Sequence, residues 1–189
     1  MIFKFHTLLY LPPLFTLLKF WYINNMQTAR IGNTSSMEKN RRVNVSAGCY
    51  LFRKLNNDKF ELLILYKKWP NGEEHFVLPK GHREKDENLE ETATRETIEE
   101  SGYVDFKLLK YLGSYTYELD WDEIQMKTDH YFLALLNTEE NTEQKPEEYE
   151  EGVSVENLWI DMEEGFKLLT FENQREIHDL VREYLKSYS

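Results

Sequence analysis

One helical segment, from Asn88 to Gly102, constrains this chain more than any other part of its sequence. Asn88 is a typical N-cap residue, and Glu91 follows three positions later, where its side chain can return a hydrogen bond to the backbone of the cap. Good helix formers continue to Ser101, and Gly102 can adopt the left-handed conformation that ends a helix. The sequence therefore predicts a helix with defined ends and a defined register.

The register of this helix turns acidic side chains toward the protein interior. Four positions lie within roughly 60° of one another when each residue turns the helix by about 100°: Leu89, Ala93, Glu96 and Glu100. Glu99 lies one flank further round. Carboxylates that share a face with apolar residues repel one another and lose water, so cations must compensate them, and oxygen ligands select Mg²⁺ or Mn²⁺. The alternative is an acidic helix on the surface, which needs no cation.

The residues around this helix resemble the Nudix box, a loop-helix-loop signature. The match consists of Gly81, Glu87 and the run Arg95-Glu96-Thr97-Ile98-Glu99-Glu100-Ser101-Gly102-Tyr103. Thr97 is the one departure, because the family usually has an aliphatic residue there. The resemblance extends from Val43 to Leu185. It implies an α/β/α sandwich with a mixed central sheet and a loop-helix-loop catalytic motif. The implied reaction is the hydrolysis of a nucleoside diphosphate linked to another group, with Mg²⁺ or Mn²⁺.

The resemblance also implies roles for single residues. The metal-binding acids would be Glu96, Glu99 and Glu100, with Glu96 a candidate base as well. The supporting residues would be Glu87 at the helix start, Arg95 as the group that orients the acids, Gly81 as the point of close backbone approach, and the Lys80 carbonyl as a further ligand. Spacing alone lets Arg95 pair with either Glu91 or Glu99.

Two motifs outside the box are similar to the Nudix hydrolases that act on dinucleoside polyphosphates. They are Leu78-Pro79-Lys80-Gly81-His82 and Lys127-Thr128-Asp129-His130-Tyr131-Phe132. The similarity nominates Lys80, His82 and Lys127 for phosphate contacts, and Tyr117 and Tyr131 for stacking on adenine. The alternatives are solvated lysines, a plain loop histidine and tyrosines that pack within the sheet. Glu151, in an acidic loop with Glu147, Glu148 and Glu150, is a candidate further base or ligand, and a solvated loop is its alternative.

Apolar patterns predict the remaining elements. Strands are predicted at residues 43–52, 60–66, 75–78, 107–117, 126–136 and 158–160, and loops at 79–87 and 137–151. Apolar residues at spacings of three and four predict a last helix: Ile177, Leu180, Val181, Tyr184 and Leu185. This order favours a mixed sheet with helices on its faces.

Composition narrows the setting of the domain. The formal net charge of −11 argues against a stable nucleic-acid partner and requires local positive charge for an anionic substrate. A single cysteine, Cys49, excludes an intrachain disulfide and suits a buried thiol in the cytoplasm. Residues 42–188 are the predicted domain, as a monomer or homodimer. Residues 1–41 are a predicted extension outside the fold, with a possible later start at Met26 or Met37, and the alternative is a membrane anchor within residues 1–23.

The leading functional hypothesis is asymmetrical cleavage of diadenosine tetraphosphate to ATP and AMP by water attack on phosphorus. One alternative is a Nudix hydrolase of diphosphoinositol phosphates, RNA 5′ ends or modified nucleoside triphosphates, because the box determines the reaction and the flanking strands select the substrate. An alternative of another class is a non-catalytic nucleotide-binding regulatory module, which would not need all of the box acids.

Overall fold

A seven-stranded sheet organises the domain, with the strand order β3-β2-β1-β6-β5, and with β4 paired to β1 and β7 paired to β2. The computed structural model describes residues 43–56, 58–120, 124–145, 152–170 and 175–188. The strands are β1 (Val43–Lys54), β2 (Phe60–Lys68), β3 (Glu74–Val77), β4 (Lys80–His82), β5 (Phe106–Asp120), β6 (Ile124–Leu136) and β7 (Ser154–Asp161). The helices are α2 (Leu89–Ser101), α3 (Met162–Leu168) and α4 (Arg175–Lys186).

The sheet is mixed because β1 has neighbours of both directions. It runs parallel to β6 and antiparallel to β2 and β4. Its first half pairs with β4 and its last residues pair with β2, so the short strand β4 lies where β2 has left β1. This arrangement brings β4 to the same stretch of β1 that α2 covers.

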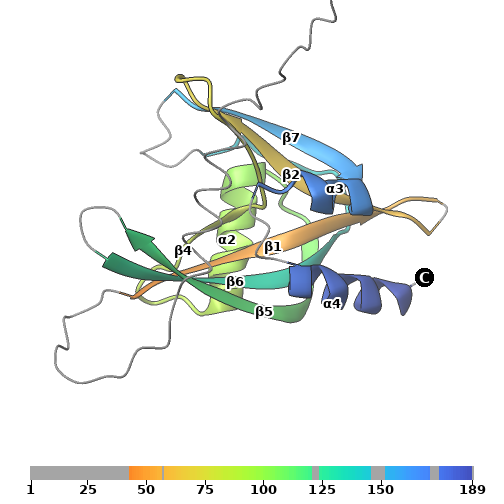
Figure 1. The fold of residues 1–189 in the computed structure, drawn as a ribbon. Coiled ribbons are helices and arrows are strands. Elements are labelled where there is room, and N and C mark those ends of the chain that lie inside the picture. The colour runs from red at the N-terminus through yellow and green to blue at the C-terminus, as the bar shows by residue number, and fades with distance from the viewer. Residues whose placement is uncertain (1–42, 57, 121–123, 146–151, 171–174, 189) are drawn as a thin grey trace, which may run out of the picture. The chain divides into compact units, whose positions relative to one another are not determined.

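Helices cover both faces of the sheet (Figure 1). On one face Ala93 of α2 packs in a buried cluster with Cys49 and Phe132. On the other face the apolar sides of α3 and α4 pack against residues such as Tyr50 and Leu133. The predicted α/β/α sandwich with a mixed central sheet is confirmed. Burial raises the pKa of the Cys49 thiol to about 12, which agrees with the predicted buried thiol.

The predicted caps of α2 are confirmed. The Asn88 side chain accepts hydrogen bonds from the backbone of Glu90 and Glu91, and the Glu91 carboxylate accepts one from the backbone of Asn88 at 2.8 Å. Gly102 ends the helix at φ 80°, in the left-handed region. Because Glu91 is engaged in this capping box, Arg95 pairs with Glu99 instead.

The structure corrects four details of the sequence interpretation. Residues 80–82 form β4 rather than loop, because their backbone pairs with Ser46, Ala47 and Gly48. The strand predicted at 158–160 is longer, since all of β7 pairs with β2. No pattern had predicted α3, whose Gly165 and Phe166 are its buried residues. Leu180 is exposed, although it was assigned to the apolar stripe of the last helix.

The N-terminal extension of residues 1–41 lies outside the described residues, so the predicted domain boundary stays a prediction. Within the described part of the chain, none of the helices is long and apolar enough to cross a bilayer.

Candidate active site

The acids of α2 lie where the helical register predicts. Glu96 is 2% exposed and Glu100 is 7% exposed, so both carboxylates face the interior. The Glu99 side chain is 32% exposed, as expected for a residue on the flank. The alternative of an acidic surface helix is therefore wrong for Glu96 and Glu100. Other groups must compensate this buried charge.

Arg95 provides part of that compensation. Its Nη1 donates to Glu96 Oε1 at 2.8 Å and to Glu99 Oε2 at 2.9 Å, which holds the two carboxylates at one nitrogen. Its Nε donates to Glu87 Oε1 at 2.6 Å, and its Nη2 donates to the carbonyl of His82 at 2.9 Å. The hydrogen bonds from Arg95 lower the pKa of Glu87 to about 2. The predicted orienting role of Arg95 thus has a geometric basis.

Gly81 has a steric reason to be a glycine. It lies opposite Ala47 in the pairing of β4 with β1, and a Cβ at this position would overlap the carboxylate of Glu96. The close approach predicted at Gly81 therefore involves the Glu96 side chain itself.

Glu100 is held by donors from β2 and β4. Lys67 Nζ lies 2.6 Å from Glu100 Oε1, and the backbone N–H of Lys80 donates to Oε2 at 2.6 Å. The sequence analysis missed Lys67, which is buried at the end of β2. The signal was strand alternation, because Leu63, Leu65 and Lys67 share a face of the sheet.

A second group of charged residues surrounds Asp129 on β6, another residue that the sequence analysis did not single out. Lys80 Nζ lies 3.1 Å from Asp129 Oδ2, and the Tyr117 hydroxyl donates to the same oxygen at 3.1 Å. Lys127 Nζ lies 4.0 Å from Oδ1. Burial lowers the pKa of Lys127 to about 8, with a further decrease from Lys80, while Asp129 and Glu100 oppose the shift. The structure thus brings together Lys80, Lys127 and Tyr117.

The other residues predicted to contact substrate or to act as a base do not join this group around Asp129. Tyr131 is 2% exposed and packs edge-on against Tyr50, so it lies in the core rather than on a surface where a base could stack. The His82 side chain is exposed, and its carbonyl contacts Arg95. Glu151 lies outside the described residues, as do Glu147, Glu148 and Glu150.

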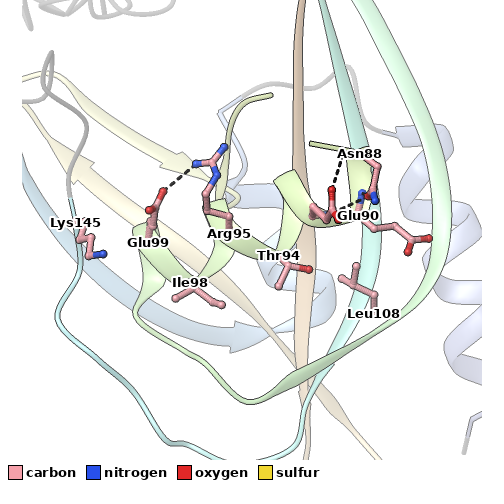
Figure 2. Close-up of a pocket in the computed structure, with 9 residues that line it drawn as sticks. Asn88, Glu90, Thr94, Arg95, Ile98, Glu99, Leu108 and Lys145 are labelled. Atoms are coloured by element: carbon pink, nitrogen blue, oxygen red, sulfur yellow. Dashed lines mark hydrogen bonds and ion pairs between the residues drawn. The ribbon is translucent and has the colours of Figure 1, made fainter. Parts of the chain in front are cut away.

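The outer side of α2 has a groove of its own. Figure 2 shows Thr94, Ile98 and Leu108 along this groove, with the Arg95–Glu99 pair beside them. Its volume is about 680 Å³, and its lining does not include Glu96 or Glu100. Arg95 and Glu99 line both this groove and the acid cluster, whereas Glu96 and Glu100 belong to the cluster alone.

The donor set fits a hard divalent cation in its chemistry. Glu96, Glu99 and Glu100 offer only oxygen, and Mg²⁺ prefers such ligands. Among the described residues no three acidic, histidine or cysteine side chains meet at one point, and Arg95 and Lys67 form ion pairs with Glu96 and Glu100.

The chain is similar in sequence to proteins of known family. A family model described as NUDIX domain matches residues 43–181. The asymmetrical bis(5′-nucleosyl)-tetraphosphatase of Mus musculus is 32% identical over 130 residues, which are 67% of this chain and 81% of that protein. The ADP-ribose pyrophosphatase of Bacillus subtilis is 35% identical over 128 residues, or 67% of this chain and 64% of that protein.

The fold has solved counterparts as well. A structure of the C. elegans Ap4A hydrolase in a binary complex superposes with a TM-score of 0.60 at 23% identity, covering 76% of this chain and 98% of that one. Nudix hydrolases generally need divalent cations such as Mg²⁺ and act on small nucleotides. Because the family model covers more than half of the chain and the curated relatives are hydrolases, this chain belongs to the Nudix family and is a pyrophosphohydrolase.

Proposed function

We propose that this enzyme cleaves dinucleoside polyphosphates asymmetrically, with diadenosine tetraphosphate hydrolysed to ATP and AMP in the cytoplasm. The observation that carries the proposal is a pair of lysines that share the carboxylate of Asp129. Lys80 Nζ lies 3.1 Å from its Oδ2, and Lys127 Nζ lies 4.0 Å from its Oδ1. In a chain of net charge −11, two ammonium groups beside the buried acids provide the local positive charge that a tetraphosphate requires. The similarity to the mouse tetraphosphatase supports the same substrate.

The acids of α2 and the Lys80 carbonyl would hold Mg²⁺ or Mn²⁺. When bound, such a cation polarises phosphoryl oxygens and lowers the pKa of water. Arg95 keeps the carboxylates of Glu96 and Glu99 in fixed orientations. Glu96 would accept the proton of the attacking water, whose oxygen bonds to one phosphorus. The bond from that phosphorus to the bridging oxygen breaks, and the bridging oxygen leaves with the second product.

ADP-ribose is a second candidate substrate, because the Bacillus subtilis relative is an ADP-ribose pyrophosphatase. ADP-ribose has two phosphates, and diadenosine tetraphosphate has four. A site with two lysines beyond the acids therefore favours the longer chain of phosphates.

The test compares kcat/KM for both compounds, with products separated by chromatography, in wild type and in a Lys80→Met/Lys127→Met variant. The matched control is Lys59→Met/Lys107→Met, which removes two exposed lysines. We expect ATP and AMP from the tetraphosphate. We also expect the paired variant to lose at least about tenfold more on the tetraphosphate than on ADP-ribose, the equivalent of roughly one charge-assisted hydrogen bond. Equal losses on the two substrates, or faster turnover of ADP-ribose by the wild type, would contradict the proposal.

A further inference from the structure

Asp129 is a buried acid whose position in the sheet is not explained by packing. It is 4% exposed on the face of β6 that also carries Tyr131 and Leu133, both of which belong to the apolar core. Burying a carboxylate among apolar residues costs free energy unless cations and hydrogen bonds compensate it. An apolar residue at this position would avoid that cost, so the acid requires another reason.

The contacts of Asp129 divide between its two oxygens. Oδ2 receives Lys80 Nζ from β4 and the Tyr117 hydroxyl from β5. Oδ1 is buried and accepts no hydrogen bond within the described part of the chain, and Lys127 Nζ lies 4.0 Å from it. The carboxylate thus lies between two lysines that come from different strands.

Each lysine would behave differently without this acid. A lysine ammonium group sits on a flexible stem of four carbons, so it can occupy many positions. Two ammonium groups that approach one another also repel. The shared carboxylate removes that repulsion and restricts both side chains to one region of the site. Lys127 and Asp129 are two positions apart on β6, so the backbone itself holds them on the same face.

The charges leave the region ready for an anion. Lys80 and Lys127 together carry one more positive charge than Asp129, and Lys67 offsets Glu100 nearby. A polyphosphate would meet two ammonium groups that are already placed, so less side-chain freedom is lost when it binds.

We propose that Asp129 is a positioning residue that holds Lys80 and Lys127 together as one preset binding element for a chain of phosphates. This inference rests on the proposed function in so far as both assign phosphate contacts to the two lysines. Asp129 itself acts through the lysines and does not touch the substrate.

The test measures binding rather than turnover. Inorganic tripolyphosphate is titrated calorimetrically, in buffer with a chelator, into the full chain as wild type, Asp129→Asn, Lys80→Met/Lys127→Met and the triple variant. The matched control is Asp105→Asn, since Asp105 is a half-buried acid that accepts side-chain hydrogen bonds from Asn137 and Thr138. Melting temperatures are recorded for all proteins.

We expect Asp129→Asn to weaken tripolyphosphate binding at least about tenfold, the equivalent of roughly one charge-assisted hydrogen bond, while Asp105→Asn binds like the wild type. The triple variant should bind no more weakly than the lysine double variant, because Asp129 acts only through the lysines. Unchanged or tighter binding in Asp129→Asn, or a further loss in the triple variant, would overturn the inference.

A second variant covers the case in which Asp129→Asn does not fold. Asp129→Glu keeps the charge and moves the carboxylate by one methylene, so we expect weaker binding from displacement alone. Wild-type affinity in Asp129→Glu would contradict a positioning role. A wild type that does not bind tripolyphosphate would refute the phosphate role of the lysines as well. If only the Asp129 variants behave like wild type, the proposed function still stands and this inference alone fails.

Discussion

The buried ion pair between Lys67 and Glu100 gives a quantitative prediction for Lys67→Met. The side chains of Lys67 and Glu100 are only 7% and 6% exposed, and their charged atoms lie 2.6 Å apart. Removing one partner of a buried pair leaves an uncompensated charge and costs about 3–5 kcal/mol. About 2–4 °C in melting temperature accompanies each kcal/mol in a domain of this size, so Lys67→Met should melt about 6–20 °C lower than the wild type.

The neighbouring lysine is a matched control for this variant. Lys68 pairs with Glu74 at 3.1 Å, but these side chains are 51% and 44% exposed, and such a pair contributes about 1 kcal/mol or less. Differential scanning calorimetry of both variants in chelator should show a large shift for Lys67→Met and almost none for Lys68→Met. Addition of Mg²⁺ should recover part of the loss in Lys67→Met, because a bound cation can replace the missing ammonium group beside Glu100.

A double variant tests the cause of the effect. Lys67→Met/Glu100→Gln removes both charges, so it should recover much of the stability lost in Lys67→Met. Equal melting temperatures for Lys67→Met and Lys68→Met would refute the reasoning, since the pair would then not be buried as described.

Two further variants test other parts of the structure. In Gly81→Ala, the added methyl group lies closer to the Glu96 carboxylate than the ~3.5 Å that non-bonded atoms need, so the carboxylate must move away by about 1 Å or more. We expect kcat to fall about 100-fold. A normal kcat would show that Glu96 does not approach Gly81. Burial, with a smaller contribution from Arg182, lowers the pKa of His178 to about 4. The unfolded state therefore binds this proton first, and stability present above pH ~6.5 should be lost toward pH ~4, by up to about 3 kcal/mol. Urea unfolding at pH 7 and 5 should show this loss in the wild type and a smaller one in His178→Phe, and parallel losses would exclude His178 as the cause.

The sequence was most informative where local chemistry determines geometry. The cap at Asn88 and the stop at Gly102 set the register of α2, and a rigid helix then determines which carboxylates point inward. This is why the burial of Glu96 and Glu100 could be predicted. The strand β4 could not be predicted in this way, because three residues that include a glycine carry no periodic pattern. Only their long-range pairing with β1 makes them a strand.

Long-range contacts also explain the residues that were missed or misassigned. Lys67 acquires its role from Glu100 of α2, and Asp129 acquires its role from Lys80 of β4, and both partners lie far away in the sequence. Lys67 and Asp129 are polar residues at core-facing positions of a strand, and that exception to alternation was the available signal. The same alternation groups Tyr131 with Leu133 in the core, so the strand pattern, and not the motif, predicts its environment correctly.

The most direct test of the account measures pyrophosphate cleavage by Glu100→Gln, with Glu90→Gln as a control on the exposed first turn of the same helix. Turnover of diadenosine tetraphosphate and ADP-ribose is followed with Mg²⁺ and with chelator, at a temperature where calorimetry shows all three proteins folded. The account predicts Mg²⁺-dependent cleavage in wild type and Glu90→Gln, and a loss of at least about 100-fold in Glu100→Gln. Full turnover in Glu100→Gln, or cleavage that persists unchanged in chelator, would contradict it.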